Sequence, residues 1–324
     1  MSSILSKRVK VFVENESELV KAHFKCAEDI WSEKNPSGYI NLGTAENDLM
    51  DQENKTILDQ CSVRTEYLHY KELHGIESLR THLADFLGST LNTNIISDNI
   101  IVSTGASAVL EMLSYALMDR GEKAITIAPY YTGFKHDISV RFENELVLSH
   151  VLNEDGEVDF EAFEKQIQST SNLRVLLFCN PHNPTGKSFS KEEVCRVIEI
   201  AKKYHLEIIS DEIYAHSLLP DKSFISTHDD TIDSDYREHI HIVYGMAKDF
   251  GISGVKVGIL YSKNKLLIKA ILNQAYFHPL STVAQMAISK YFEDKVMLDK
   301  YLTTYRSRLA KHSENICQFL DSLD

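Results

Sequence analysis

The sequence predicts an α/β fold in which helices cover both faces of a mainly parallel sheet. Short β-branched runs alternate with longer segments of helical periodicity, as they do in α/β folds. The short runs are apolar throughout, which is typical of strands buried on both faces. With 324 residues and a hydrophobic content of 43%, the chain is long enough to bury a sizeable core.

The first expected strand, NIIVS at 99–103, leads through Thr104 and Gly105 into a helical stretch at 107–119. This order of strand, glycine turn and helix is the beginning of a layered α/β fold. Further strands are expected at 124–129, 174–180, 206–212, 239–248 and 256–262.

A capping box indicates where one helix between these strands begins. Ser190 is followed three residues later by Glu193, so each side chain can bond to the other's backbone in a helix at 190–205. After the last strand the pattern is almost wholly helical and ends in an amphipathic segment at 299–324. We expect an N-terminal arm with part of a small domain at 1–44, a large domain at 45–275, and the start of an incomplete small domain at 276–324.

Composition excludes several classes of function. The chain has 47 acidic and 34 basic residues, and its net charge of -13 repels nucleic acid and anionic membranes. The N-terminus lacks an uninterrupted apolar h-region, which predicts a cytoplasmic protein. The 5 cysteines and 14 histidines are dispersed, so we expect neither a disulfide framework nor a metal site.

The heptad NPHNPTG, Asn180 to Gly186, is the most distinctive motif. It follows an expected buried strand, where ligands bind in open α/β sheets. A turn stiffened by proline is the alternative interpretation, because Asn-Pro steps favour turns for steric reasons alone.

Three motifs in a fixed order resemble the class I/II aminotransferases. They are Asn180–Gly186, Asp211–Tyr214 with the letters DEIY, and Gly245–Lys248 with the letters GMAK. The resemblance extends from about Gly43 to about Gly258. It implies pyridoxal 5'-phosphate as cofactor and the three-layer, aspartate aminotransferase-like large domain of fold type I.

The resemblance implies a role for four residues around the cofactor ring. Lys248 would form a Schiff base and then act as general base, and Asp211 would keep the ring nitrogen protonated. Asn183 and Tyr214 would donate hydrogen bonds to the 3'-oxygen. The alternatives are a solvated surface lysine, an aspartate that caps the next helix, and two residues with structural roles.

Other residues resemble the family's phosphate and ring contacts. Gly105, Ala106 and Ser107 would form the phosphate cup at a helix N-terminus, with Lys256 in place of the usual arginine. Tyr131 would stack on the ring. An ordinary strand-to-helix turn and a core aromatic are the alternatives.

Tyr70 resembles the tyrosine that reaches the cofactor phosphate of the neighbouring subunit, which implies a homodimer. The match is imperfect, because that tyrosine usually precedes His-Gly directly, where this chain has Leu73. Gly245 and Ala247 also depart from the family, since hydroxyl-bearing residues near the lysine usually help to hold the phosphate.

Two segments resemble the 1-aminocyclopropane-1-carboxylate synthase subgroup. Gly43–Asn47 is similar to its G-x-A-E-N block, and the run from Lys248 to Gly254 is similar to its K-D-x-G-x-x-G run. Glu46 would lie near the substrate, and a solvated loop acid is the alternative.

The expected function is transamination of a small α-amino acid through Lys248. One alternative is α,γ-elimination of S-adenosylmethionine to 1-aminocyclopropane-1-carboxylate, as in the subgroup. Another is a non-catalytic relative, because family members continue through a small domain whose substrate-binding arginine has no match here.

Overall fold

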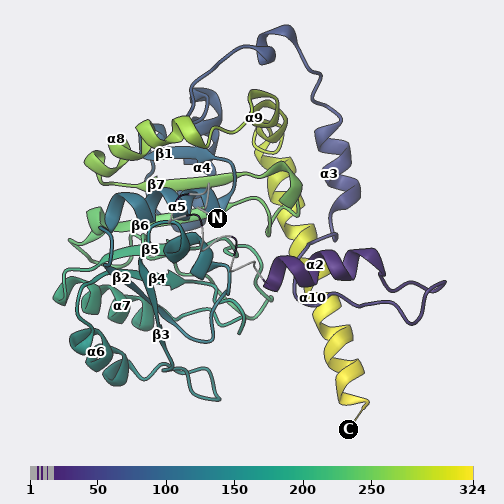
Figure 1. Ribbon diagram of the computed structural model, residues 1–324. Helices are drawn as coiled ribbons and strands as arrows, with labels where there is room; N and C mark the ends of the chain where they lie inside the picture. Colours follow the sequence, from purple (N-terminus) through teal and green to yellow (C-terminus); the bar gives the residue numbers. More distant parts are fainter. Residues whose placement is uncertain (1–5, 7–8, 10–12, 14–17, 324) are drawn as a thin grey trace, which may run out of the picture.

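The computed structural model describes residues 6, 9, 13 and 18–323, and within them it contains a seven-stranded sheet (Figure 1). The strands are β1 (Ile100–Ser103), β2 (Lys123–Ile127), β3 (Glu145–Ser149), β4 (Leu173–Cys179), β5 (Glu207–Asp211), β6 (Ile240–Gly245) and β7 (Gly258–Ser262). Their order across the sheet is β1-β7-β6-β5-β4-β2-β3. The predicted strands are therefore confirmed, with small differences at their ends.

The sheet is mainly parallel, as predicted. Only β7 among the described strands runs antiparallel to its neighbours β1 and β6. Lys256 has a left-handed backbone with φ of 60°, so β7 begins at Gly258 rather than at the predicted residue 256. The strand β3 was not predicted from the sequence, because it is a short edge strand that is buried only at its last residue, Ser149.

Helices cover both faces, which makes three layers. One face carries α4 (Glu77–Leu91), α6 (Phe160–Ser169) and α7 (Lys191–Lys203), and the other carries α5 (Ala106–Leu117) and α8 (Lys265–Gln274). The alternation of side chains along β4 explains why one strand serves both layers. Leu176 and Phe178 pack on the α6 and α7 side, whereas Val175 and Leu177 pack on the α5 side.

The predicted C-terminal helix is α10 (Lys295–Asp321), which begins before residue 299 because Asp294 caps it. It follows α9 (Thr282–Ser289). Tyr301 and Tyr305 in its first half belong to the same core as α4, and its second half extends away from the sheet (Figure 1). The remaining helices of eight or more residues in the described chain are α2 (Glu18–Glu28) and α3 (Asp51–Leu58).

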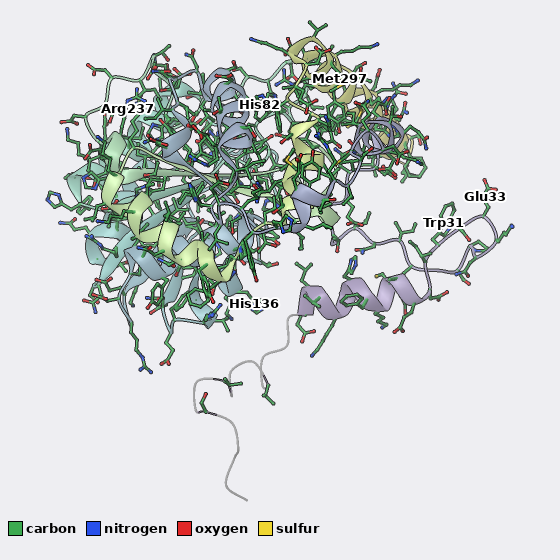
Figure 2. The ribbon with its side chains drawn as sticks, turned by 90° about the horizontal axis from the view of Figure 1, so that it is seen from above. Trp31, Glu33, His82, His136, Arg237 and Met297 are labelled. Atoms are coloured by element: carbon green, nitrogen blue, oxygen red, sulfur yellow. The ribbon has the colours of Figure 1, made fainter. Side chains whose placement is uncertain are left out.

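The segment around α2 lies apart from the rest of the molecule. None of the described residues of α2 is buried. Figure 2 shows the following loop, with Trp31 and Glu33, on the far side of α2 from the sheet. The cavity described below is therefore built without this segment.

The capping box of α7 gives a direct test of the predicted helix start. Ser190 Oγ accepts a hydrogen bond from the Glu193 backbone at 3.2 Å, and the Glu193 carboxylate accepts one from the Ser190 backbone at 2.8 Å. We expect Ser190→Ala to lower the free energy of unfolding by about 1 kcal/mol, measured by urea denaturation. Ser190→Asp keeps the acceptor and should stay close to wild type; equal losses in both variants would contradict the capping role.

Candidate active site

A cavity of about 210 Å³ lies where the carboxyl ends of several strands meet. The strands β1, β4, β5 and β6 all end at this edge of the sheet, and the antiparallel β7 begins there. Ligands bind at this edge in open α/β sheets. The predicted site residues that line the cavity are Gly105, Ala106, Ser107, Tyr131, Asn183, Asp211, Tyr214, Lys248 and Lys256.

Lys248 follows β6 and is half-buried in the cavity wall. Its Nζ donates a hydrogen bond to the backbone carbonyl of Ala45 at 2.7 Å. Burial lowers the pKa of the Lys248 amine, and nearby Lys256 lowers it further, while Glu46 and Asp211 act in the opposite direction. A lowered pKa increases the neutral fraction of the amine, which is its nucleophilic and basic form.

Asp211 ends β5 with its side chain only 6% exposed. Burial raises the pKa of this carboxyl to about 7, and the nearby carboxylates of Asp137 and Glu212 raise it too. A hydrogen bond from the Ile213 backbone N–H, at 3.3 Å, lowers it. The alternative that Asp211 caps the next helix is wrong, because turns follow it and the next helical segment is Arg237–His239.

Asn183 and Tyr214 meet in the cavity although they lie on different loops. Asn183 Nδ2 donates a hydrogen bond to the Tyr214 hydroxyl oxygen at 3.1 Å. Burial and the nearby Asp211 raise the pKa of Tyr214, so its hydroxyl keeps its proton at neutral pH. The hydroxyl is therefore a hydrogen-bond donor that Asn183 orients.

The turn at Gly105 opens α5 toward the cavity. Gly105 precedes the first helical residue and has φ of 100°, a conformation that glycine adopts without strain. The backbone N–H groups of the first helical turn, including Ala106 and Ser107, are positioned to bind an anion. Gly258 of β7 lies directly against this turn, since a Cβ there would be 2.2 Å from Gly105 backbone atoms.

Two predicted residues lie outside the cavity lining. Tyr70 is 99% exposed and borders a separate hollow of about 480 Å³ together with Pro279. Glu46 is next to the cavity, where its carboxylate accepts a hydrogen bond from Ser253 at 2.9 Å. Ser253 lines the cavity.

Other lining residues were not predicted from the sequence, among them Asp137, Thr104 and Cys179. Thr104 and Cys179 directly adjoin predicted motifs, and their position at strand ends is the signal by which they could have been found. Asp137 lies in a π-helical turn, His136–Val140, that no sequence pattern announced.

Behind Lys248, Asp249 is completely buried and its carboxylate accepts three hydrogen bonds. Ser217 Oγ donates at 2.6 Å, the His216 backbone at 3.0 Å and the Tyr244 hydroxyl at 2.8 Å. Tyr305 of α10 extends the network, with its hydroxyl 2.7 Å from Ser217 Oγ. Burial nevertheless raises the pKa of Asp249 to about 6.

The next residue, Phe250, is held by α3 and α10. Its carbonyl accepts a hydrogen bond from Asn54 Nδ2 at 2.8 Å and lies 2.9 Å from the Tyr301 hydroxyl. Its ring stacks on Tyr301 with centroids 5.6 Å apart. Helices distant in sequence therefore fix the loop that carries Lys248.

At the opposite end of the sheet, Ser262, His241 and Glu207 form a chain of side-chain contacts. His241 Nδ1 lies 2.8 Å from Ser262 Oγ, and His241 Nε2 lies 3.1 Å from the Glu207 carboxylate. The order resembles a hydrolytic triad. His241 and Ser262 have no exposed surface, so a substrate cannot reach them and the chain is structural.

The described residues contain no group of three or more His, Cys, Asp or Glu side chains suited to hold a metal ion. No helix within them is long and apolar enough to span a membrane.

The contact between Gly258 and Gly105 predicts a specific sensitivity. Gly258→Ala should lower the free energy of unfolding by about 1–3 kcal/mol, because the added methyl group overlaps the backbone of the anion-binding turn. Gly254→Ala is the matched control, since a Cβ at Gly254 meets nothing within 4 Å. Equal urea unfolding midpoints for Gly258→Ala and Gly254→Ala would rule out the tight contact between Gly258 and Gly105.

The buried Asp249 carboxylate predicts a second sensitivity. Asp249→Asn turns an amide N–H toward a hydrogen-bond donor, which should lower the free energy of unfolding by about 1–3 kcal/mol. Asp221→Asn, at an exposed position, should leave it unchanged. If chemical denaturation gives both variants wild-type stability, the carboxylate does not hold the loop.

Comparison with known proteins identifies the family. Residues 37–324 match the model of the class I and II aminotransferases. A probable aminotransferase of Arabidopsis thaliana is 28% identical over 299 residues, which are 86% of this chain and 60% of that protein. A probable inactive 1-aminocyclopropane-1-carboxylate synthase-like protein of Mus musculus is 29% identical over 320 residues, covering 92% of this chain and 54% of that protein.

This chain therefore spans less than two thirds of the length of these two relatives. Among solved structures, a Thermus thermophilus aspartate aminotransferase mutant in complex with tryptophan superposes with a TM-score of 0.82 at 23% identity. The superposition covers 100% of this chain and 81% of that one, and it confirms the predicted aspartate aminotransferase-like fold. Together with the ordered motifs around the cavity, the family match shows that this chain belongs to the class I and II aminotransferases.

Proposed function

We propose that this chain is a pyridoxal-phosphate-dependent enzyme that transaminates a small α-amino acid through Lys248. The observation that carries the proposal is the cavity itself. It brings the Lys248 amine together with a buried carboxylate, two oriented hydrogen-bond donors and an open helix N-terminus.

The residues present fit this cofactor. Asp211 is a buried carboxyl whose side chain accepts a hydrogen bond from the Ile213 backbone, so a protonated ring nitrogen would complete its environment. Tyr214 and Asn183 suit a phenolic oxygen, and the turn at Gly105 suits a phosphate. When bound, pyridoxal phosphate supplies an electron sink for charge that develops at the substrate Cα.

Each residue would then perform one task. Lys248 would attach the cofactor covalently and later carry the Cα proton, while Asp211 would hold the proton of the ring nitrogen. The N–H groups at Gly105, Ala106 and Ser107, with the Lys256 ammonium, would bind the phosphate. Tyr131, whose ring packs against Phe134 at 5.3 Å, would support the face of the cofactor ring, and Glu46 would face the substrate.

We further propose a cytoplasmic homodimer in which Tyr70 reaches the partner's cavity. Its almost complete exposure, away from the cavity of its own chain, supports this role. The division into an arm at 1–44, a large domain at 45–275 and the start of a small domain at 276–324 remains part of the same proposal.

Elimination on S-adenosylmethionine is the second candidate, and the contacts of the 43–47 segment favour it. Asn47 Nδ2 donates to the Lys248 carbonyl at 2.9 Å, and a Cβ at Gly251 would lie 2.3 Å from the Asn47 carbonyl oxygen. The segment that resembles the synthase block is thus packed on the lysine loop. A non-catalytic role is the third candidate, because Gly245 and Ala247 lack hydroxyl groups.

Covalent capture of the cofactor tests the proposal. Wild-type protein incubated with pyridoxal phosphate and reduced with borohydride should carry a stable pyridoxyl group on Lys248, located by peptide mass spectrometry. Lys248→Ala should carry none at any position, whereas Lys256→Ala should retain the modification at reduced affinity. Unmodified wild-type protein would refute the cofactor proposal and leave the non-catalytic role.

Product analysis then separates the two enzymatic candidates. An α-keto acid formed with an amino acceptor supports transamination, and release of methylthioadenosine from S-adenosylmethionine supports elimination. Modified wild-type protein that yields neither product would support the non-catalytic role.

A further inference from the structure

Asp137 lies in the cavity wall, and the function proposed above gives it no task. It belongs to the π-helical turn His136–Val140, a rare geometry that is frequent at functional sites. Its neighbour His136 lies at the outer surface, as Figure 2 shows. The turn therefore brings one carboxylate into the cavity.

The Asp137 carboxylate lies beside the expected phosphate site. Ser107, in the first turn of α5, is close enough for its hydroxyl to lower the pKa of this carboxyl. Its second oxygen, Oδ2, is buried and has no hydrogen-bond partner among the described residues. A buried acceptor without a partner is costly, and a proton on that oxygen would make it a donor to a ligand oxygen.

The charged groups around Asp137 are of both signs. Glu111 follows Ser107 by one turn on α5, and Asp211 lines the same cavity as Asp137. Glu111 is engaged elsewhere, with Arg141 and, at 2.9 Å, with His278. The ammonium groups of Lys248 and Lys256 line the same cavity, and the Tyr131 hydroxyl is close enough for Asp137 to raise its pKa.

These surroundings favour the protonated form of Asp137. Burial raises the pKa of its carboxyl to about 6. The nearby Ser107 hydroxyl opposes that rise, and the charge of Glu111 adds to it. A phosphate dianion in the same cavity is a further like charge, which raises the pKa of a carboxyl again.

We propose that Asp137 takes up a proton from solvent when a phosphate monoester binds at the Gly105–Ser107 turn. The carboxylate becomes a carboxylic acid, and no other bond forms or breaks. The proton removes repulsion between two anions and gives the buried oxygen a hydrogen to donate. This inference rests on the proposed function, in which the cofactor phosphate occupies that turn.

Because ligand binding is coupled to proton uptake by Asp137, affinity should depend on pH. Below about pH 6 the carboxyl is already protonated in the unliganded protein, so binding requires no proton there. At higher pH each binding event takes up a proton, and affinity falls by up to about tenfold per pH unit until the pKa of the complex is reached.

Titration calorimetry with pyridoxine 5'-phosphate tests the inference, because this ligand lacks the aldehyde and does not react with Lys248. Affinity is measured from about pH 5 to about pH 8 for wild type and Asp137→Asn. The ratio of the dissociation constant of wild type to that of Asp137→Asn should be near one at the acidic end of this range. It should rise at least about tenfold at the alkaline end, with wild type weaker.

Two controls separate Asp137 from other ionisations. The second ionisation of the phosphate occurs with both proteins and cancels in the ratio. Pyridoxine without phosphate should show no pH-dependent ratio. Buffers of different ionisation enthalpy should reveal up to one additional proton taken up by wild type. Asp137→Ser replaces Asp137→Asn if circular dichroism shows that the asparagine variant is unfolded.

The possible outcomes separate the role of Asp137 from the proposal that the cavity binds the cofactor. A ratio that does not change with pH, with equal proton uptake, overturns the role of Asp137 and leaves the cofactor proposal intact. If neither protein binds pyridoxine 5'-phosphate at any pH, the cofactor proposal fails and the inference fails with it.

Discussion

The carboxylate of Asp249 is completely buried immediately behind Lys248, and the protein itself must solvate it. Three donors do so, from the turn after β5 and from β6. Because a buried charge without these donors is strongly unfavourable, the loop cannot shift without breaking the network. Because Asp249 directly follows Lys248, its hydrogen bonds set the direction in which Lys248 leaves the sheet. The cavity that Lys248 lines depends on the same hydrogen bonds.

The network extends from the sheet to helices at both ends of the chain. Asn54 of α3 and Tyr301 of α10 meet at the Phe250 carbonyl, and the Tyr305 hydroxyl meets Ser217. A residue pair from α3 and α10, Glu53 and Arg308, adds an ion pair at 2.7 Å. The same aromatic and amide side chains pack the core and hold the loop that carries Lys248. The position of the candidate catalytic amine therefore depends on the packing of the core.

The departures from the family pattern have a physical explanation in part. A Cβ at Gly245 would lie 2.9 Å from the Val257 carbonyl oxygen, so a serine there requires movement of Val257, which directly precedes β7. Lys256 occupies a left-handed turn at the cavity and keeps a positive charge there, although an ammonium lacks the bidentate geometry of a guanidinium. Positive charge in the cavity lining comes from Lys248 and Lys256, and the carboxyl groups of Asp211 and Asp137 belong to the same lining.

The sequence by itself determined six of the seven described strands, the capped helix at Ser190 and the order of motifs around Lys248, because these depend on local periodicity and on residues close in the chain. The resemblance of its motifs to the class I/II aminotransferases also indicated most of the cavity lining. Only the tertiary structure decided that β7 runs antiparallel, that Tyr70 lies outside the cavity and that Asp137 lies inside it. Burial and contacts between distant segments place those residues, and no local pattern encodes them.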